Sequence, residues 1–373
     1  MSVSTRVISS LLIAGLLFVL HPSRAQTFGE TGSDRTDAPT SASAVERIVE
    51  AHMSAKPIPG LSVAVAQNGR MVHQSASGIT NLVSMQPASN HSIYQLASVT
   101  KIITGIGLMI LVDEGRLALD DSIHQHLPSL PQAWSGVTVR QVVSHTSGLP
   151  PLLDENGNFP GGSRATAWER AKKDSLIEEP GTVWRYSQMG GEVIRRVAEE
   201  ITDQSWERFV HERILEPANM QSTYFLHEAP PDSSRVTTGY DLENGSLIAH
   251  EWSTSYDYYI PTAMGIFSTT TDLARLMTEL RTERLLSPSA QRAMWTPVRH
   301  EEGGMAGWGD GTVGYGIGWV VDSDHERPRK WHSGGGHSTL VYYPQVDLTV
   351  IVLTNLSGAQ PNAIASEIAA QFL

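Results

Sequence analysis

One apolar run sets where the main buried helix of this chain of 373 residues must lie. Between Ile102 and Val112 the large apolar side chains recur at helical spacing. That pattern predicts a helix that is buried on most of its surface. Glu114 and Gly115 follow it and supply the end of the helix. We therefore expect the rest of the chain to pack around this segment.

Ser98 and Lys101 stand at the start of that helix. A separation of three residues places both side chains on one helical face, one turn apart. The lysine amine can bond the serine hydroxyl once burial has lowered its pKa enough to make it neutral. Amides at the helix N-terminus can also face an incoming carbonyl oxygen, as in sites with a nucleophilic serine. The structural alternative is that Ser98 caps the helix and Lys101 reaches solvent, and Ser-x-x-Lys alone often arises by chance.

The first 25 residues have the three parts of a secretory signal peptide. Arg6 gives the positive start, residues 11–20 the apolar core, and Ser23-Arg24-Ala25 a small-residue cleavage site. The apolar core is too short to span a bilayer comfortably, and no other long apolar run exists. We therefore expect a periplasmic or secreted protein with no transmembrane segment in its mature form.

Residues 26–41 are polar and rich in Gly, Ser, Thr and Asp. This composition predicts a disordered linker after the signal peptide. The remaining residues, 42–373, are long enough to bury a sizeable core, and we expect them to form the folded domain.

Cysteine usage and net charge narrow the classes of function. The chain has no cysteine, which excludes a disulfide framework, thiol catalysis and a cysteine-linked lipid anchor. The formal net charge is −12 at pH 7, and loss of Arg6 and Arg24 with the signal peptide brings it to about −14. Such an acidic surface disfavours nucleic acid and anionic membranes as partners.

Strand patterns lie at both ends of the chain, and helical patterns lie mostly between them. Residues 61–66 alternate and are followed by a second strand pattern at 71–77, with the Asn68-Gly69 hairpin signal between them. Further strands are expected at 317–321, 339–343 and 348–353, and helices at 43–54, 137–144, 165–175, 192–201, 206–214, 271–281 and 361–373. This order predicts an α+β fold. An antiparallel sheet formed by the N- and C-terminal strands is flanked by helices and carries a mostly helical inserted subdomain.

Three stretches, in this order, resemble the signature motifs of the serine β-lactamase and penicillin-binding-protein superfamily. They are Ser98-Val99-Thr100-Lys101, Tyr186-Ser187-Gln188 and His332-Ser333-Gly334-Gly335. The likeness covers about residues 43 to 373 and is closest to the class C-like branch, which holds esterases, D-amino-acid peptidases and β-lactamases. Several motifs in order are far more specific than any one of them.

The resemblance implies a β-lactamase/transpeptidase-like fold and a serine hydrolase that works through an acyl-enzyme without a cofactor. By that likeness Ser98 attacks the substrate, and Lys101 and Tyr186 move protons. A neighbouring Lys101 cation is expected to lower the pKa of the Tyr186 phenol. His332 is expected to orient the tyrosine or the substrate.

The glycine run of the third motif has an expected role of its own. Gly334, Gly335 and Gly336 permit a close backbone approach, and without the other motifs they would indicate only a turn between strands. By the resemblance, the amides of Ser98 and Gly335 form the oxyanion hole.

Two positions depart from the family pattern. Gln188 stands where asparagine is usual. By the resemblance, that asparagine donates a hydrogen bond to the acyl amide of the substrate. His332 stands where many β-lactamases have lysine, and a mostly neutral histidine is a weaker partner for a substrate carboxylate. The second change favours an ester or a D-amino-acid peptide over a β-lactam as the small-molecule or peptide substrate. The first keeps open a non-hydrolysing protein that binds penicillin or cell-wall peptides. The oligomeric state stays undetermined.

Other candidates have plainer interpretations. His145 resembles a family position with a structural role. His337 lies close to His332, but no metal-ligand motif accompanies the pair, so no metal is expected. The aromatic residues Tyr256 and Tyr259 fit the lining of an acyl pocket and ordinary packing equally well. No Gly-x-Ser-x-Gly elbow is present, which argues against an α/β-hydrolase.

Overall fold

A computed structural model describes residues 41–250, 260–299, 304–308, 313–323 and 326–373. The expected signal peptide, nearly all of the expected linker and the aromatic segment at 256–259 lie outside the described residues. No helix within the described ranges is long and apolar enough to cross a membrane.

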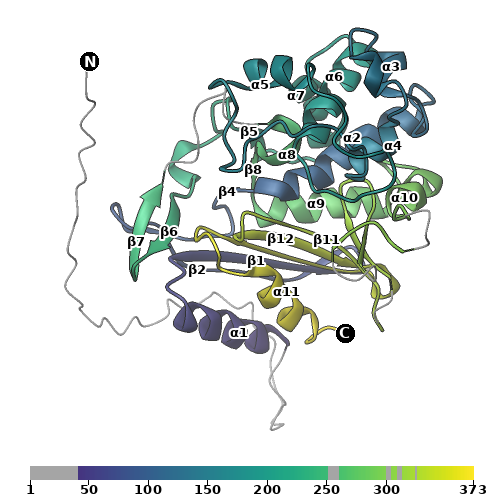
Figure 1. Cartoon of the computed structure of the whole chain (residues 1–373). Helices are drawn as coiled ribbons and strands as arrows, with labels where there is room; N and C mark the ends of the chain where they lie inside the picture. The colour runs from purple at the N-terminus through teal and green to yellow at the C-terminus, as the bar shows by residue number, and fades with distance from the viewer. Residues whose placement is uncertain (1–40, 251–259, 300–303, 309–312, 324–325) are drawn as a thin grey trace, which may run out of the picture. The chain divides into compact units, whose positions relative to one another are not determined.

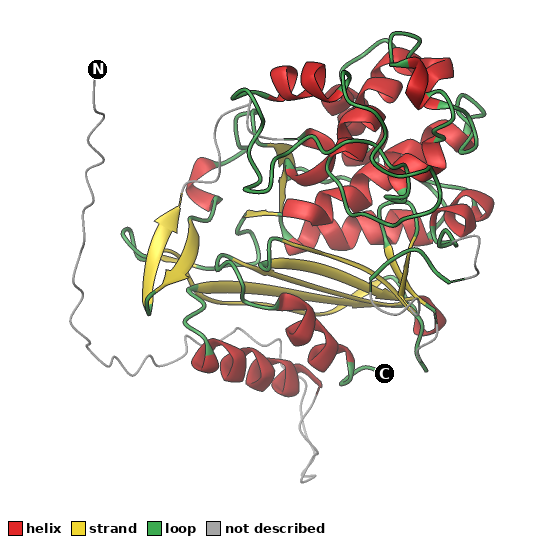
Figure 2. Ribbon diagram, in the orientation of Figure 1, coloured by secondary structure: helices red, strands yellow, loops and turns green. Residues whose placement is uncertain are grey.

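An eight-stranded sheet carries the fold (Figure 2). Its strands are β1 (Gly60–Gln67), β2 (Arg70–Asn81), β3 (Gln86–Pro87), β9 (Val313–Tyr315), β10 (Val320–Asp322), β11 (Arg329–Gly334), β12 (Ser338–Tyr343) and β13 (Leu348–Thr354). They lie in the order β3-β2-β1-β13-β12-β11-β10-β9, and every neighbouring pair is antiparallel. Strands from the two ends of the chain therefore meet inside one sheet, and the predicted α+β arrangement is confirmed.

The first hairpin forms where the Asn-Gly signal predicted it. Asn68 and Gly69 join β1 to β2 with φ angles of 52° and 72°. A two-residue turn with both residues in the left-handed region matches the twist of the paired strands, and asparagine and glycine adopt that region most readily.

Helices cover both faces of the sheet. The main ones are α1 (Ser41–Ala55), α2 (Thr100–Asp113), α4 (Val139–Val143), α5 (Arg164–Ala171), α6 (Met189–Thr202), α7 (Trp206–Val210), α9 (Thr270–Arg281), α10 (Pro288–Met294) and α11 (Pro361–Ala369). Shorter elements are α3 (Ile123–His126), α8 (Pro261–Met264), the 3₁₀ turns η1 (Ala97–Val99), η2 (Gln132–Trp134), η4 (Ser233–Arg235) and η6 (Pro344–Val346), and the π-turn η3 (His211–Leu215). Small strand groups join β4 (Tyr94–Gln95) and β5 (Tyr224–Phe225) to β8 (Ile266–Ser268), and pair β6 (Gly239–Glu243) with β7 (Ser246–His250).

Alternation along the central strands divides the core into two parts. In β13, Val350 and Val352 pack in a cluster with α1 and α11, whereas Ile351 and Leu353 pack in the larger cluster with α2 and α9. Figure 1 shows α1 and α11 on one side of the sheet and α2 and α9 on the other. Helix α2 is buried from its first residue to Leu111, as its apolar pattern predicts.

One predicted strand begins later than expected. Residues 317–319 form a bend, and β10 starts only at Val320. In this bend Gly318 has φ +74°, and a Cβ atom on it would lie 2.1 Å from the Lys101 carbonyl oxygen. Gly105 makes the reciprocal approach, because its Cβ would lie 2.3 Å from the Ile317 carbonyl oxygen. The bend thus rests directly on the backbone of α2, which excludes a regular strand there.

Candidate active site

Ser98 and Lys101 stand where the short turn η1 runs into α2. Ala97, the residue before the serine, has a φ angle of 43°. This left-handed conformation is strained for alanine, so contacts with the surrounding structure must stabilise it. Lys101 Nζ lies 3.4 Å from Ser98 Oγ. The two side chains therefore share one face of the helix start, as their spacing predicts.

Two carbonyl oxygens hold the Lys101 amine in place. Its Nζ donates to Gln188 Oε1 at 2.9 Å and to the Ala263 carbonyl oxygen at 3.0 Å. Lys101 is only 6% exposed, and no acidic side chain pairs with it among the described residues. Burial lowers its pKa to about 7, so neutral and charged amine are both populated near neutral pH. In the neutral amine the two N–H groups match the two carbonyl oxygens, and the lone pair is left for the Ser98 hydroxyl.

Tyr186 lies beside this pair, in the segment that precedes α6. Lys101 Nζ is 4.9 Å from the centroid of its ring. The hydroxyl is buried and makes no hydrogen bond of good geometry within the part of the chain that the structure describes. Burial raises the pKa of Tyr186, and the Ser98 hydroxyl offsets part of this rise. The expectation that the Lys101 cation lowers this pKa is wrong, because the cost of a buried phenolate outweighs the attraction. The phenol is therefore a proton donor in the resting site.

The glycine run brings the third motif against the serine. A Cβ on Gly334, the last residue of β11, would lie 2.3 Å from the Leu96 carbonyl oxygen and 2.6 Å from the Ser98 nitrogen. Gly335 follows with φ +56°, and a Cβ on it would lie 3.3 Å from that of Ala97. Among the backbone hydrogen bonds of the described turns and loops, none is donated by the Gly335 amide. The close backbone approach is as expected, and the oxyanion role of the two amides stays a prediction.

Two buried side chains fasten this turn. His337 Nδ1 lies 3.1 Å from the Gly335 carbonyl oxygen, and Ser338 Oγ donates to the Leu96 carbonyl oxygen at 2.6 Å. Burial lowers the pKa of His337 to about 4, so its imidazole is neutral. No group of three or more metal-binding side chains gathers within the described ranges.

His332 of β11 is neutral, and its hydrogen bonds are used within the protein. Its Nδ1 lies 2.8 Å from the Ser333 carbonyl oxygen and its Nε2 3.0 Å from the Tyr315 hydroxyl. A carbonyl oxygen only accepts, so Nδ1–H donates and Nε2 accepts from Tyr315. Burial and the nearby Lys101 lower the pKa of His332 to about 3. The tyrosine that His332 contacts by a hydrogen bond is therefore Tyr315, and any action on Tyr186 or on a substrate stays a prediction.

His145 lies between the two tyrosines. Its ring centroid is 4.5 Å from that of Tyr186 and 4.7 Å from that of Tyr315. Its Nδ1 accepts from the Ser187 amide at 3.3 Å, which leaves the proton on Nε2. Burial holds the pKa of His145 well below its usual range, and the nearby Lys101 charge lowers it further. Its contacts fit the structural role that the resemblance implies.

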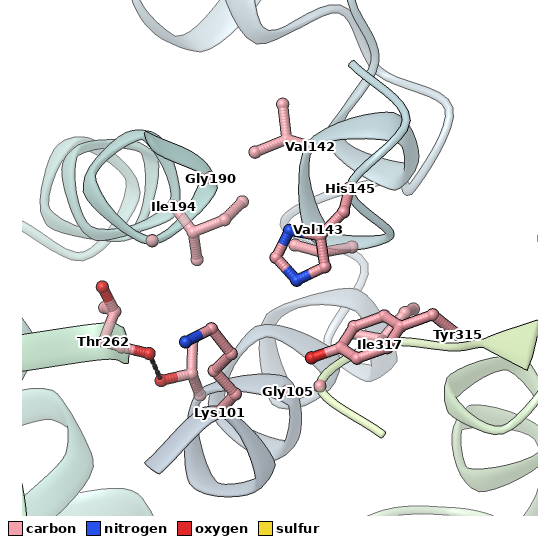
Figure 3. Close-up of a pocket in the computed structure, with 13 residues that line it drawn as sticks. Lys101, Gly105, Val142, Val143, His145, Gly190, Ile194, Thr262, Tyr315 and Ile317 are labelled. Atoms are coloured by element: carbon pink, nitrogen blue, oxygen red, sulfur yellow. Dashed lines mark hydrogen bonds between the residues drawn. The ribbon is translucent and has the colours of Figure 1, made fainter. Parts of the chain in front are cut away.

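A small cavity adjoins these groups (Figure 3). It has a volume of about 30 Å³, enough for one water molecule. Its polar lining includes Lys101, His145, Thr262 and Tyr315. Figure 3 shows the imidazole of His145 directed toward the space between the Lys101 amine and the Tyr315 hydroxyl.

Sequence reasoning did not select two contributors to this site. Tyr315 lies outside the three motifs, and its hydrogen bond to His332 depends on the pairing of β9, β10 and β11. The Ala263 carbonyl oxygen is a backbone atom and carries no sequence signal. For Tyr315 the available signal was its place directly before the glycine-rich stretch Gly316-Ile317-Gly318.

Comparisons with known proteins show which family this chain is similar to. A profile of the Beta-lactamase family matches residues 45–372. Penicillin-binding protein 4* of Bacillus subtilis (strain 168) is 28% identical over 79% of this chain and 67% of its own length. Protein flp of Staphylococcus aureus (strain N315) is 24% identical over 84% of this chain and 63% of its own length. The chain thus matches about two thirds of the length of these relatives.

Two solved structures share the fold. The octameric penicillin-binding protein homologue from Pyrococcus abyssi has a TM-score of 0.76 and 25% identity, covering 88% of this chain and 76% of its own. EstCE1, described as a hydrolase with promiscuous acyltransferase activity, has a TM-score of 0.76 and 19% identity, covering 88% of this chain and 98% of its own. Both have mixed α/β folds of the β-lactamase/transpeptidase type. With the family profile matched over most of its length, the chain belongs to the Beta-lactamase family of serine β-lactamase and penicillin-binding-protein-like proteins.

Proposed function

We propose that this protein is an exported serine hydrolase that forms an acyl-enzyme on Ser98. The observation that carries the proposal is the buried Lys101 amine, 3.4 Å from the Ser98 hydroxyl and with its pKa lowered to about 7. A neutral amine in hydrogen-bond reach of a serine is the base that a nucleophilic hydroxyl requires. Membership of a family with hydrolase relatives supports the same chemistry.

In the acylation step, neutral Lys101 takes the Ser98 proton while Oγ forms a bond to the substrate carbonyl carbon. The amides of Ser98 and Gly335 hold the resulting oxyanion. The bond from the carbonyl carbon to the leaving oxygen or nitrogen then breaks. The leaving atom takes the proton of the Tyr186 hydroxyl, and the Lys101 ammonium restores that proton.

Deacylation uses the same groups in the reverse direction. A water molecule attacks the acyl carbon and gives one proton to neutral Lys101. Ser98 Oγ leaves and recovers a proton from the lysine, which regenerates the resting site. The motifs include no equivalent of the deacylating glutamate of class A β-lactamases, so Lys101, with the Tyr186 hydroxyl beside it, activates this water.

The charge of the site favours uncharged substrates. β-Lactams and D-alanyl-D-alanine ends carry a carboxylate, and a cation near the third motif is its natural partner. Here His332 is neutral, with a pKa of about 3, and both of its ring nitrogens are already hydrogen-bonded. We therefore place neutral esters first, uncharged D-amino-acid peptides second and β-lactams third.

The decisive experiment compares the wild-type chain with Ser98→Ala on p-nitrophenyl acetate and on nitrocefin. Turnover of the ester should fall by about 10⁴-fold or more in the variant, because the nucleophile is lost. Ser84→Ala, at an exposed turn residue, is the matched control and should keep full activity. Intact-protein mass spectrometry should detect an acyl adduct on the wild-type chain and none on Ser98→Ala.

A non-hydrolysing binder of penicillin or cell-wall peptides gives a different result. Such a protein would form a stable adduct with benzylpenicillin at one equivalent and turn over neither substrate. Ester turnover that persists in Ser98→Ala would contradict the proposal, because the nucleophile would then lie elsewhere.

Export has its own test. Residues 1–25 carry the pattern of a signal peptide, so the mature chain should begin at Gln26. N-terminal sequencing of protein from the periplasm or medium checks this. A chain that keeps Met1 and stays in the cytoplasm would contradict it.

A further inference from the structure

An exposed indole stands next to the buried catalytic groups. Trp308 is 40% exposed. Its ring centroid lies 4.6 Å from that of Trp184, 5.4 Å from that of Tyr186 and 5.8 Å from that of Tyr315. It is thus the outermost ring of a four-ring aromatic group whose inner members border the site.

This exposure is unusual within the described part of the chain. The other large hydrophobic side chains with comparable exposure there are all aliphatic or methionine. Apolar surface left in water gains free energy when a ligand covers it, and an aromatic face gains more from an aromatic partner than its area alone provides. An indole held in this position therefore presents a ready surface to an apolar group.

The contact between the Trp308 and Tyr186 rings indicates which end of a substrate lies against the exposed indole. In the proposed mechanism the Tyr186 hydroxyl protonates the leaving atom, so the leaving group lies beside that phenol. Because the Trp308 indole packs against Tyr186, it borders the leaving-group side of the site. Trp184 and Tyr315, whose rings contact that of Trp308, are uncharged, so these rings offer packing and no counter-ion for a carboxylate.

We propose that Trp308, supported by Trp184, forms a leaving-group subsite for an aromatic or bulky apolar alcohol. The substrate class is then an ester whose apolar part is on the alcohol side. This inference rests on the proposed hydrolase function, and it adds a specificity-determining residue that takes no part in proton transfer.

The test uses two acetates that differ only in the leaving alcohol, 1-naphthyl acetate and ethyl acetate. Trp308→Ala should lower kcat/KM for the naphthyl ester by about tenfold, the upper range of an aromatic contact. For the ethyl ester kcat/KM should change by less than about twofold, since ethanol is too small to cover the indole. Trp308→Phe should recover most of the loss. A shared acetyl-enzyme intermediate means that deacylation is the same for both substrates, so the difference reports acylation.

Two controls separate the subsite from a general role. Trp331→Ala removes a tryptophan that packs in the α1–α11 cluster, on the opposite face of the sheet, and should leave the naphthyl-to-ethyl ratio unchanged. The ratio of p-nitrophenyl butyrate to p-nitrophenyl acetate should also be unchanged in Trp308→Ala, because the acyl side does not meet the indole.

The failures are distinguishable. Equal losses on both acetates would give Trp308 a structural role only and overturn the subsite while the hydrolase stands. A change only in the ratio of p-nitrophenyl butyrate to p-nitrophenyl acetate would place the indole on the acyl side of the substrate. That result would also overturn the leaving-group subsite. A wild-type chain that hydrolyses neither ester removes the proposed function, and the subsite with it.

Discussion

Two buried ionisable side chains near the start of α6, Lys101 and Glu192, have partners of different charge. Lys101 contacts Gln188, the residue that precedes the first turn of α6, and it has no acidic partner among the described residues. Glu192 lies in that first turn and is fully buried. Burial acts against the charged form of both side chains.

Arginines surround the glutamate. Its carboxylate bonds Arg195 at 2.8 Å and Arg196 at 2.9 Å, and Arg164 of α5 lies 3.7 Å away. Burial acts to raise the pKa of Glu192, but hydrogen bonds and charge from these guanidinium groups lower it on balance. Lys101 meets only neutral oxygens, and burial lowers its pKa to about 7. Both side chains are buried, yet Glu192 stays an anion and Lys101 titrates near neutral pH, and the difference lies in their partners.

Removal of the lysine should have the largest effect on activity. Lys101→Met deletes the base, and we expect kcat/KM for p-nitrophenyl acetate to fall about 10³-fold, within the range for lost general-base catalysis. The melting temperature should change little, because removal of a buried amine without an anionic partner offsets the loss of its hydrogen bonds to Gln188 and Ala263. Lys173→Met, at an exposed position, is the control for lost charge. Activity retained in Lys101→Met would contradict the assignment of Lys101 as the base, and with it the contrast with Glu192.

Glu192 should show the opposite balance. Glu192→Gln leaves buried guanidinium groups without their anion, and we expect a loss of about 3 kcal/mol in the free energy of unfolding, measured in urea. The kcat of the molecules that remain folded should change little. Glu200→Gln, an exposed acid on the same helix, should cost almost nothing. A large loss of kcat with unchanged stability would mean that the cluster belongs to the active site.

The pH dependence of the wild-type chain tests the state of the lysine. The neutral amine is the base, and it predominates above its pKa of about 7. The kcat/KM for an uncharged ester should therefore rise with pH through about 7 and level off above it. At pH 6 it should be about tenfold below the plateau, as one pH unit requires. A profile that is flat between pH 5 and 9 would contradict a titrating lysine.

A smaller change in activity is expected when Lys101 is given a partner of opposite charge, as Glu192 has. Gln188→Glu places a carboxylate where an amide oxygen now lies 2.9 Å from Lys101 Nζ. An opposite charge at that distance raises a lysine pKa by about one unit or more, so the midpoint of the pH profile should move upward and activity at pH 7 should fall about fivefold. Gln188→Asn, which adds no charge, should keep the midpoint near 7. An unmoved midpoint in Gln188→Glu would show that the measured pKa belongs to another group.

The sequence contained much of the fold. Asn68-Gly69 predicted the first hairpin, the apolar run after Lys101 predicted α2, and strand patterns at both ends predicted one shared sheet. These succeed because periodicity and turn chemistry are local properties. The bend at 317–319 was predicted as a strand because its close contact with Gly105 is visible only in three dimensions.

The site was accessible to sequence reasoning in part. The spacing of Ser98 and Lys101 predicted their contact. The protonation state of Tyr186 was predicted wrongly, because burial decides it and the phenol keeps its proton beside a lysine. The mostly neutral state expected of His332 is confirmed, and burial lowers its pKa further. The hydrogen bond from Tyr315 to His332 joins separate strands and has no local pattern.

The strand order has a consequence for how the chain is completed. Strand β13 lies between β1 and β12, so the strand that joins the N-terminal hairpin to the C-terminal strands comes after both of them in the sequence. Until it is inserted, the strand carrying His332 and the hairpin of β1 and β2 have no common support. A chain cut short before Leu348 would lose the middle of its sheet, and a nascent chain cannot assemble the sheet that supports its active site before β13 itself has been synthesised.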